Sequence, residues 1–238
     1  MSGHSKWAQI KHKKASTDAK KSAVFSKLTA LITVAAREGG GDLNSNPKLR
    51  MAAEKARSYN MPAENIERAI KKGTGELEGQ VLEELFIEAY GPNGRPILIT
   101  AVTDSKNRTI SEIKHILSTF DGKMAGNGSV KWMFEEKGQI ILEEQKLNDE
   151  LELSLIEAGA EDIKEEDGTI IITCKTENFE KVKEAISKLG IKISESSIAF
   201  LPKNPETIPE EEKEHLSKLF EVLDDHQDVA EIYSTINF

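Results

Sequence analysis

The chain of 238 residues has one cysteine, Cys174, so it can form no internal disulfide, which is typical of proteins of the reducing cytoplasm. It also has no apolar run near the roughly 18 residues that a membrane-spanning helix requires. In a secretory signal an apolar segment follows the basic N-terminus, and this sequence has no such segment there. We therefore expect a cytoplasmic protein with no membrane partner.

Catalytic motifs are scarce too. There is no Gly-x-Ser-x-Gly, and Gly73-Thr74-Gly75 is followed by no Gly-Lys-Ser/Thr, so this segment predicts a hinge rather than a phosphate loop. Cys174 alternates with Ile170 and Ile172, a pattern that favours a buried strand residue over a nucleophile. Asp224-Asp225-His226 is followed by no second histidine, which argues against a metal site. The sequence thus predicts no enzymatic activity, metal, cofactor or small-molecule substrate.

The most informative feature is the uneven charge. The whole chain has a formal charge of −9. Residues 1–75 hold 15 basic and 6 acidic residues, a net charge of +9, whereas residues 76–238 hold 17 and 35, a net charge of −18. Such a basic segment predicts contact with a polyanion, and nucleic acid is the partner that fits it.

The candidate nucleic-acid contacts are basic or aromatic residues of this segment: Lys6, Trp7, Lys11, His12, Lys13, Lys14, Lys20, Lys21, Lys27, Lys48 and Arg50. Trp7 could stack on a base, but anchoring of the N-terminal arm to the helices is the favoured interpretation. A second candidate contact is Lys106, Asn107 and Arg108. There the alternative is a helix N-terminus capped by Asp104 or Ser105, with Arg108 as a solvent-exposed charge.

Periodicity predicts three helices in the basic segment, over 17–38, from Asn46-Pro47 onward and from about Pro62 to Gly73. Two strands at 82–90 and 96–103 then flank a Gly-Pro-Asn-Gly turn, followed by a helix at 107–120, an exposed loop at 121–128 and a strand at 129–136. Residues 138–201 follow the order β-α-β-β-α-β of a ferredoxin-like unit. The segment 76–136 then has three predicted strands and one helix. A last helix at 210–223 and a strand at 229–235 would add the helix and the strand that it lacks.

The expected fold is therefore α+β, with an N-terminal three-helix domain and two ferredoxin-like α+β domains, the third inserted into the second. The predicted boundaries are 1–75 for the basic nucleic-acid-binding domain, 76–137 plus 203–238 for the middle domain, and 138–202 for the inserted domain.

Several stretches in fixed order resemble the YebC/PmpR family of bacterial and mitochondrial proteins over essentially the full length. They are Ser2 to Trp7 with Ile10 to Lys14, Asn46 to Arg50, Asn60 to Pro62 with Asn65 to Gly73, Tyr90 to Pro92, Asn107 to Thr109, and Gly128 to Val130 with Trp132 and Phe134. The resemblance implies the same three-domain fold. It also implies a cytoplasmic, non-enzymatic regulator of gene expression that binds DNA through its basic N-terminal domain.

The mitochondrial relative is a translational activator of cytochrome oxidase, and other members resemble ribosome-associated factors that relieve stalling at proline-rich stretches. The resemblance therefore leaves ribosomal RNA and the ribosome as alternative partners. No helix-turn-helix with a Gln/Asn/Arg-rich recognition helix is evident, and lysines outnumber arginines in the N-terminal segment. Both features favour contacts with phosphates over the reading of bases. On physical grounds they favour RNA as the partner, whereas the usual description of the family favours DNA.

Overall fold

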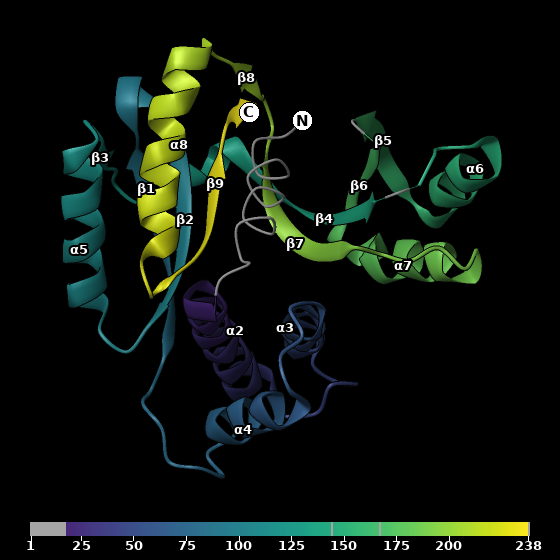
Figure 1. Ribbon diagram of the computed structural model, residues 1–238, viewed down its shortest axis with the longest axis horizontal. Helices are drawn as coiled ribbons and strands as arrows, with labels where there is room; N and C mark the ends of the chain where they lie inside the picture. The colour runs from purple at the N-terminus through teal and green to yellow at the C-terminus, as the bar shows by residue number, and fades with distance from the viewer. Residues whose placement is uncertain (1–17, 144, 167, 238) are drawn as a thin grey trace. The chain divides into compact units, whose positions relative to one another are not determined.

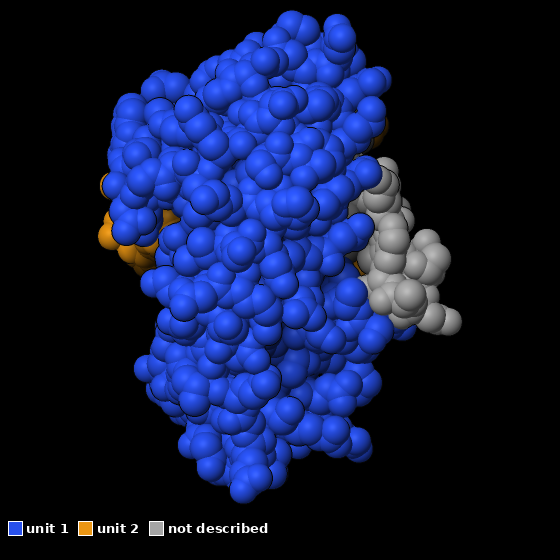
Figure 2. All heavy atoms as spheres, turned by 90° about the vertical axis from the view of Figure 1, so that its left-hand side faces the viewer, with its two compact units in different colours: residues 1–134, 202–238 blue, residues 135–201 orange. Residues whose placement is uncertain are grey.

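The computed structural model describes residues 18–143, 145–166 and 168–237 (Figure 1). The chain divides into two compact units (Figure 2). One unit runs to Phe134 and resumes at Pro202; the other is Glu135–Leu201. Within the described ranges, no helix combines the length and apolarity needed to cross a membrane.

The first unit begins with the three predicted helices, α2 (Asp18–Gly39), α3 (Pro47–Ser58) and α4 (Ala63–Gly73). Asn46 caps α3, because its side chain accepts a hydrogen bond from the Leu49 amide at 3.0 Å. The helices share one apolar core, which includes Ile32, Leu49 and Ile66. α4 approaches α2 closely at Gly73, where an added Cβ would lie only 2.4 Å from the Thr33 carbonyl oxygen.

The same unit then forms a four-stranded sheet in the order β3-β1-β2-β9. The strands are β1 (Glu83–Tyr90), β2 (Pro96–Thr103), β3 (Lys123–Met124) and β9 (Val229–Ser234). Helices α5 (Lys106–Thr119) and α8 (Glu210–Asp225) lie side by side on one face of this sheet (Figure 1). The C-terminal segment thus returns to the middle of the chain, as element counting predicted, and β9 pairs antiparallel with β2.

The core of this layer pair lies between the sheet and the two helices. Leu85, Ile87 and Ala89 of β1 point into it, because alternate residues of a strand face the same side. We call the opposite side, which carries Phe86 and Glu88, the outer face of the first sheet. Helix α2 contacts β2 and β9 of this sheet.

The second unit has the predicted ferredoxin-like order, with strands β4 (Phe134–Glu143), β5 (Ala160–Glu166), β6 (Thr169–Lys175) and β7 (Glu195–Pro202) and helices α6 (Asp149–Ala158) and α7 (Phe179–Lys188). Its sheet order is β5-β6-β4-β7. Cys174 is fully buried, as predicted. Burial raises the pKa of its thiol to about 11, so the thiol is not a nucleophile at neutral pH.

The predicted strand over residues 129–136 is wrong in its first half. The strand begins only at Phe134, after a single 3-10 turn at Lys131–Met133, and it continues to Glu143 as β4. Residues 134–136 therefore belong to the second sheet and are no separate strand of the first sheet. The cause is Glu88, whose carboxylate accepts hydrogen bonds from the backbone amides of Gly128, Val130 and Lys131 at 2.6, 2.6 and 2.8 Å. Amides that converge on one carboxylate cannot also form a strand ladder.

Two segments predicted to be irregular contain short strands. Within the predicted loop 121–128, β3 pairs with β1. Within the proline-rich linker, β8 (Glu206–Thr207) pairs parallel with β10 (Ile236–Asn237). Strands of two residues carry too little periodicity to be seen in a sequence.

Candidate nucleic-acid interface

Most of the predicted contacts in the N-terminal arm lie outside the described residues. These are Lys6, Trp7, Lys11, His12, Lys13 and Lys14. The backbone of Lys20 belongs to the first turn of α2, but its side chain is outside the described part as well. Their role in nucleic-acid contact stays a prediction. Lys21 is exposed, and its ammonium lies 5.9 Å from the centre of the Phe25 ring.

Lys27 is bound within the protein. Its side chain is only 10% exposed, and its ammonium donates to the backbone carbonyl of Asp224 on α8. The Asp224 carboxylate lies 3.5 Å from the same nitrogen. Because a cation at the C-terminal end of a helix also interacts favourably with the helix dipole, Lys27 fastens α2 to the last turn of α8.

Lys48 and Lys55 have the same kind of role on α3. The Lys48 ammonium lies 2.6 Å from Glu84 of β1 and 2.9 Å from Glu38, and Lys55 forms an ion pair with Glu231 of β9. Burial alone would lower the pKa of Lys48, but the two carboxylates outweigh it and raise that pKa. We call Lys27, Lys48 and Lys55 the linking lysines. They join the helical domain to acids of the middle domain, so part of the charge asymmetry serves contacts within the protein.

The Arg50 side chain also forms hydrogen bonds within the helical domain. Its guanidinium donates to the backbone carbonyls of Leu43 at 3.2 Å and Asn44 at 3.5 Å. These carbonyls belong to the loop between α2 and α3, so Arg50 holds that loop against α3.

Apart from Lys21, the basic side chains that remain available were not among the predicted contacts. In the described part of the chain, six exposed cations of the helical domain form no ion pair or side-chain hydrogen bond: Lys21, Arg37, Arg57, Arg68, Lys71 and Lys72. The spacing i, i+3, i+4 of Arg68, Lys71 and Lys72 in α4 was the signal that could have found three of them.

Three of these cations lie on the same helix, α4. Arg68, Lys71 and Lys72 share the side of α4 opposite to the buried Ile66 and Ala69. We call Arg68, Lys71 and Lys72 the α4 basic face. Grouped exposed cations of this kind can contact a phosphate backbone.

At the second candidate contact, Arg108 is not the solvent charge that the alternative interpretation described. It donates to Asp228 at 2.8 Å and lies 3.0 Å from Asp104. Ser105 is the N-cap residue of α5, as one alternative held, but its side chain forms no capping bond. Instead the Thr103 hydroxyl accepts from the Ser105 amide at 2.9 Å. Lys106 and Asn107 are exposed beside this network.

The Arg108 network includes groups that could ligate a metal. Ligand atoms of Glu112, His226 and Asp228 lie within 4.8 Å of one another. However, the Arg108 guanidinium is 4.0 Å from Glu112 and donates to Asp228, so positive charge is already supplied there. His226 Nε2 lies 2.9 Å from Glu112, and its Nδ1 accepts from the Asp228 amide. We interpret the group as an ion-pair network and assign no metal.

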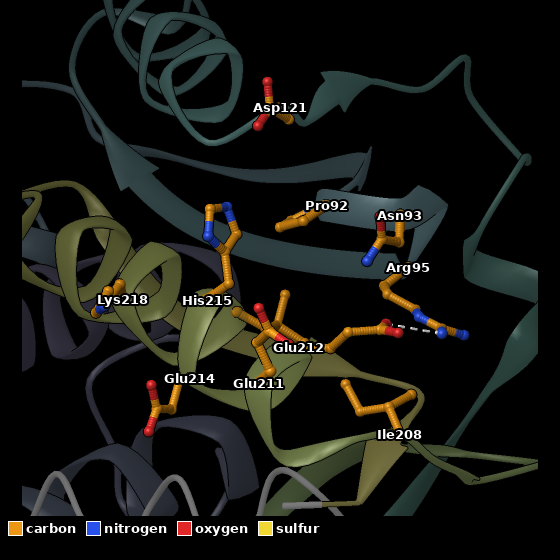
Figure 3. A pocket seen from close by; sticks show the side chains of 11 residues that line it. Pro92, Asn93, Arg95, Asp121, Ile208, Glu211, Glu212, Glu214, His215 and Lys218 are labelled. Atoms are coloured by element: carbon orange, nitrogen blue, oxygen red, sulfur yellow. Dashed lines mark hydrogen bonds and ion pairs between the residues drawn. The ribbon is translucent and has the colours of Figure 1, made fainter.

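A pocket of about 610 Å³ lies between the turn at Pro92–Gly94 and the first half of α8 (Figure 3). Figure 3 shows Arg95 paired with Glu212, at 2.9 Å. The side chains that line the pocket include four carboxylates, those of Asp121, Glu211, Glu212 and Glu214. These carboxylates outnumber the two cations of the lining, Arg95 and Lys218, which disfavours phosphate, so we do not place the nucleic-acid contact there.

Comparison with known proteins agrees with this architecture. The profile of the TACO1/YebC N-terminal domain matches residues 5–76, and that of the TACO1/YebC second and third domain matches residues 82–236. A crystal structure of a conserved hypothetical protein from Aquifex aeolicus has a TM-score of 0.86 and 42% identity, covering 97% of this chain and 96% of that one.

Similar curated proteins cover the whole chain. A "probable transcriptional regulatory protein" of Thermoanaerobacter pseudethanolicus is 51% identical, covering 99% of this chain and 97% of its own. One of Thermotoga maritima with the same description is 48% identical, covering 98% and 93%. Both profiles and these relatives lead to one assignment. The chain belongs to the TACO1/YebC family, with its three N-terminal helices and two antiparallel-sheet domains.

Proposed function

We propose that the protein is a non-enzymatic, cytoplasmic regulator of gene expression that holds nucleic acid through its basic helical domain. The observation that carries this proposal is the α4 basic face, whose exposed cations form no ion pair with the described residues. The names of the relatives, which describe transcriptional regulators, support a role in regulation. We take the domain boundaries to be 1–75, 76–137 plus 203–238, and 138–202.

The linking lysines explain how such a domain stays oriented on an acidic protein. Each pairs with a carboxylate of the middle domain, on α8, β1 or β9. The acidic surfaces of the middle domain, such as the pocket beside α8, disfavour a polyanion, which makes the outward side of the helical domain the main approach for nucleic acid. The arm lysines Lys6, Lys11, Lys13 and Lys14, together with Lys20 and Lys21, would extend the contact along the backbone.

DNA is the first candidate, because the relatives are named as transcriptional regulators. One feature of α4 favours the alternative, ribosomal RNA on the ribosome. Major-groove helices read bases with their N-terminal residues, and here that half of α4 carries Glu64 and Glu67. Acidic residues there oppose insertion into a groove, whereas the cations of the C-terminal half suit phosphates. Such contacts give little sequence discrimination, as in recognition of RNA by shape.

The test is nucleic-acid binding by charge-reversed variants. In the first, Arg68→Glu, Lys71→Glu and Lys72→Glu remove three cations of the α4 basic face; in the second, Lys13, Lys14, Lys20 and Lys21 are changed to Glu. A matched control reverses three exposed lysines of the second unit, Lys181, Lys188 and Lys192. Fluorescence anisotropy with a labelled duplex is measured across a salt series, and circular dichroism checks folding.

We expect both test variants to bind at least about tenfold more weakly than the wild type, and the control to bind as the wild type does. The α4 variant should also lower the slope of log K against log salt by about 2.7 for duplex DNA, because each phosphate contact contributes about 0.9. Unchanged affinity in both test variants would move the interface away from the helical domain. Co-sedimentation with ribosomes, with promoter DNA as competitor, then decides between the two polyanions.

A further inference from the structure

The outer face of the first sheet carries a second kind of surface, formed by exposed aromatic rings and lysines. Phe86 of β1 is 42% exposed, and Trp132, in the turn before β4, is 62% exposed. The ammonium of Lys131 lies 4.4 Å from the centre of the Phe86 ring. Rings next to cations are typical of surfaces that bind single-stranded nucleic acid, because the ring stacks on a base while the cation contacts phosphate.

This surface is held in place by the buried carboxylate of Glu88. Phe86 and Glu88 are two residues apart on β1 and therefore point to the same side of the sheet. By accepting from the amides of Val130 and Lys131, Glu88 fixes the turn that carries Trp132 and brings Lys131 to the Phe86 ring. The Trp132 indole N–H donates to the Ser129 carbonyl at 3.0 Å, which orients the ring. A preorganised surface loses less entropy when it binds.

The charges around the rings favour an anionic partner. Lys123 lies opposite Tyr90 in the pairing of β3 with β1, so it shares the outer face with Phe86. Phe86, which Lys131 contacts, and Tyr90, which lies opposite Lys123, are about 13 Å apart along β1. The two lysines therefore occupy separate positions on the outer face. The two carboxylates of this strand face are already compensated, Glu84 by Lys48 and Glu88 by three amides.

We propose that this surface, made of Phe86, Lys123, Lys131 and Trp132, binds unpaired nucleotides of single-stranded nucleic acid. The bases stack on Phe86 and Trp132, and the lysines contact the phosphates. The proposal rests on the proposed function and adds to it: the helical domain holds the backbone of the nucleic acid, and the middle domain selects strands whose bases are unpaired. A protein partner fits less well, because the two large exposed apolar side chains of this surface, Phe86 and Trp132, are aromatic.

The test uses the full chain and three labelled probes, a dT 12-mer, a U 12-mer and a 12-base-pair duplex. Phe86→Ala and Trp132→Ala remove the rings, and Phe86→Tyr and Trp132→Phe retain an aromatic ring. Val222→Ala, which removes part of an exposed apolar side chain on α8, is the matched control. In a Trp7→Phe background the only remaining tryptophan is Trp132, so quenching of its fluorescence reports stacking directly.

We expect each alanine variant to weaken binding of at least one single-stranded probe by about tenfold, with duplex binding unchanged, because paired bases cannot stack on the rings. The aromatic variants and the control should bind within about twofold of the wild type, and the single strand should quench Trp132. A larger effect with U than with dT identifies RNA as the source of the strand.

Unchanged single-strand binding by both alanine variants, without quenching of Trp132, would overturn this inference and leave the proposed function intact. Equal losses for single strands and duplex would overturn it too, since stacking would not be the cause. Failure of the wild type to bind any of the probes or ribosomes would instead overturn the proposed function.

Discussion

The carboxylate of Glu88 should be one of the most sensitive polar groups in the first unit. It is 8% exposed, and Oε1 accepts from the Gly128 amide while Oε2 accepts from the Val130 and Lys131 amides. In Glu88→Gln only one oxygen remains, so the new amide nitrogen faces at least one N–H donor. An unpaired buried donor costs about 1–3 kcal/mol, and the other bonds lose their charge assistance. We expect the free energy of unfolding to fall by about 2–4 kcal/mol.

The assay is urea denaturation at pH 7, followed by tryptophan fluorescence. Glu84→Gln is the matched control: Glu84 is four residues away on the same face of β1, and its ion pair with Lys48 is partly exposed. We expect this control to lose less than about 1 kcal/mol. A loss within about 0.5 kcal/mol for Glu88→Gln would refute the view that this carboxylate holds the turn.

The same variant should show a defined pH dependence. Burial alone would raise the pKa of Glu88, but hydrogen bonds from three amides outweigh it and lower that pKa. A lowered pKa in the folded state stabilises the protein above the ordinary carboxyl pKa of about 4.3, and the stabilisation is lost as the pH falls through the folded value. The difference between wild type and Glu88→Gln should therefore be constant above about pH 5 and shrink in more acidic solution.

Two further predictions concern buried groups. Burial alone would raise the pKa of Asp228, but hydrogen bonds from Thr109 and Arg108 outweigh it and lower that pKa. Asp228→Asn should therefore lower the free energy of unfolding, measured in urea, by about 2–3 kcal/mol at pH 7 and by less at pH 3. An equal loss at both pH values would contradict this. The thiol of Cys174, with a pKa of about 11, should react with a maleimide at pH 7.5 at least about 100 times more slowly in the folded protein than in 6 M guanidinium, and a similar rate in both would contradict its burial.

The sequence was sufficient to predict those parts of the fold that depend on local signals. Asn46-Pro47 marks the start of α3 because the cap and the proline act within one helical turn. The return of the C-terminal segment followed from a different argument: α8 and β9 needed partners, and the middle domain was short of a helix and a strand. The sheet order in which β9 joins β2 agrees with that argument.

The features that the sequence did not predict depend on partners that are distant in the chain. The turn at residues 128–131 depends on Glu88, about 40 positions earlier, so strand-like alternation around Trp132 was misleading. The role of Lys27 depends on Asp224, 197 positions away, and that of Lys55 on Glu231, 176 positions away. A count of lysines predicts a basic surface but does not show which lysines are paired within the fold. Conversely, the α4 basic face follows from helical spacing alone.

The central claim is that the helical domain holds nucleic acid through cations that the fold leaves unpaired. Its most direct test is the salt dependence of duplex binding by the wild type and by the variant with Arg68→Glu, Lys71→Glu and Lys72→Glu. For this variant we expect weaker binding and a slope of log K against log salt that is smaller by about 2.7. The same affinity and slope in both proteins would contradict it.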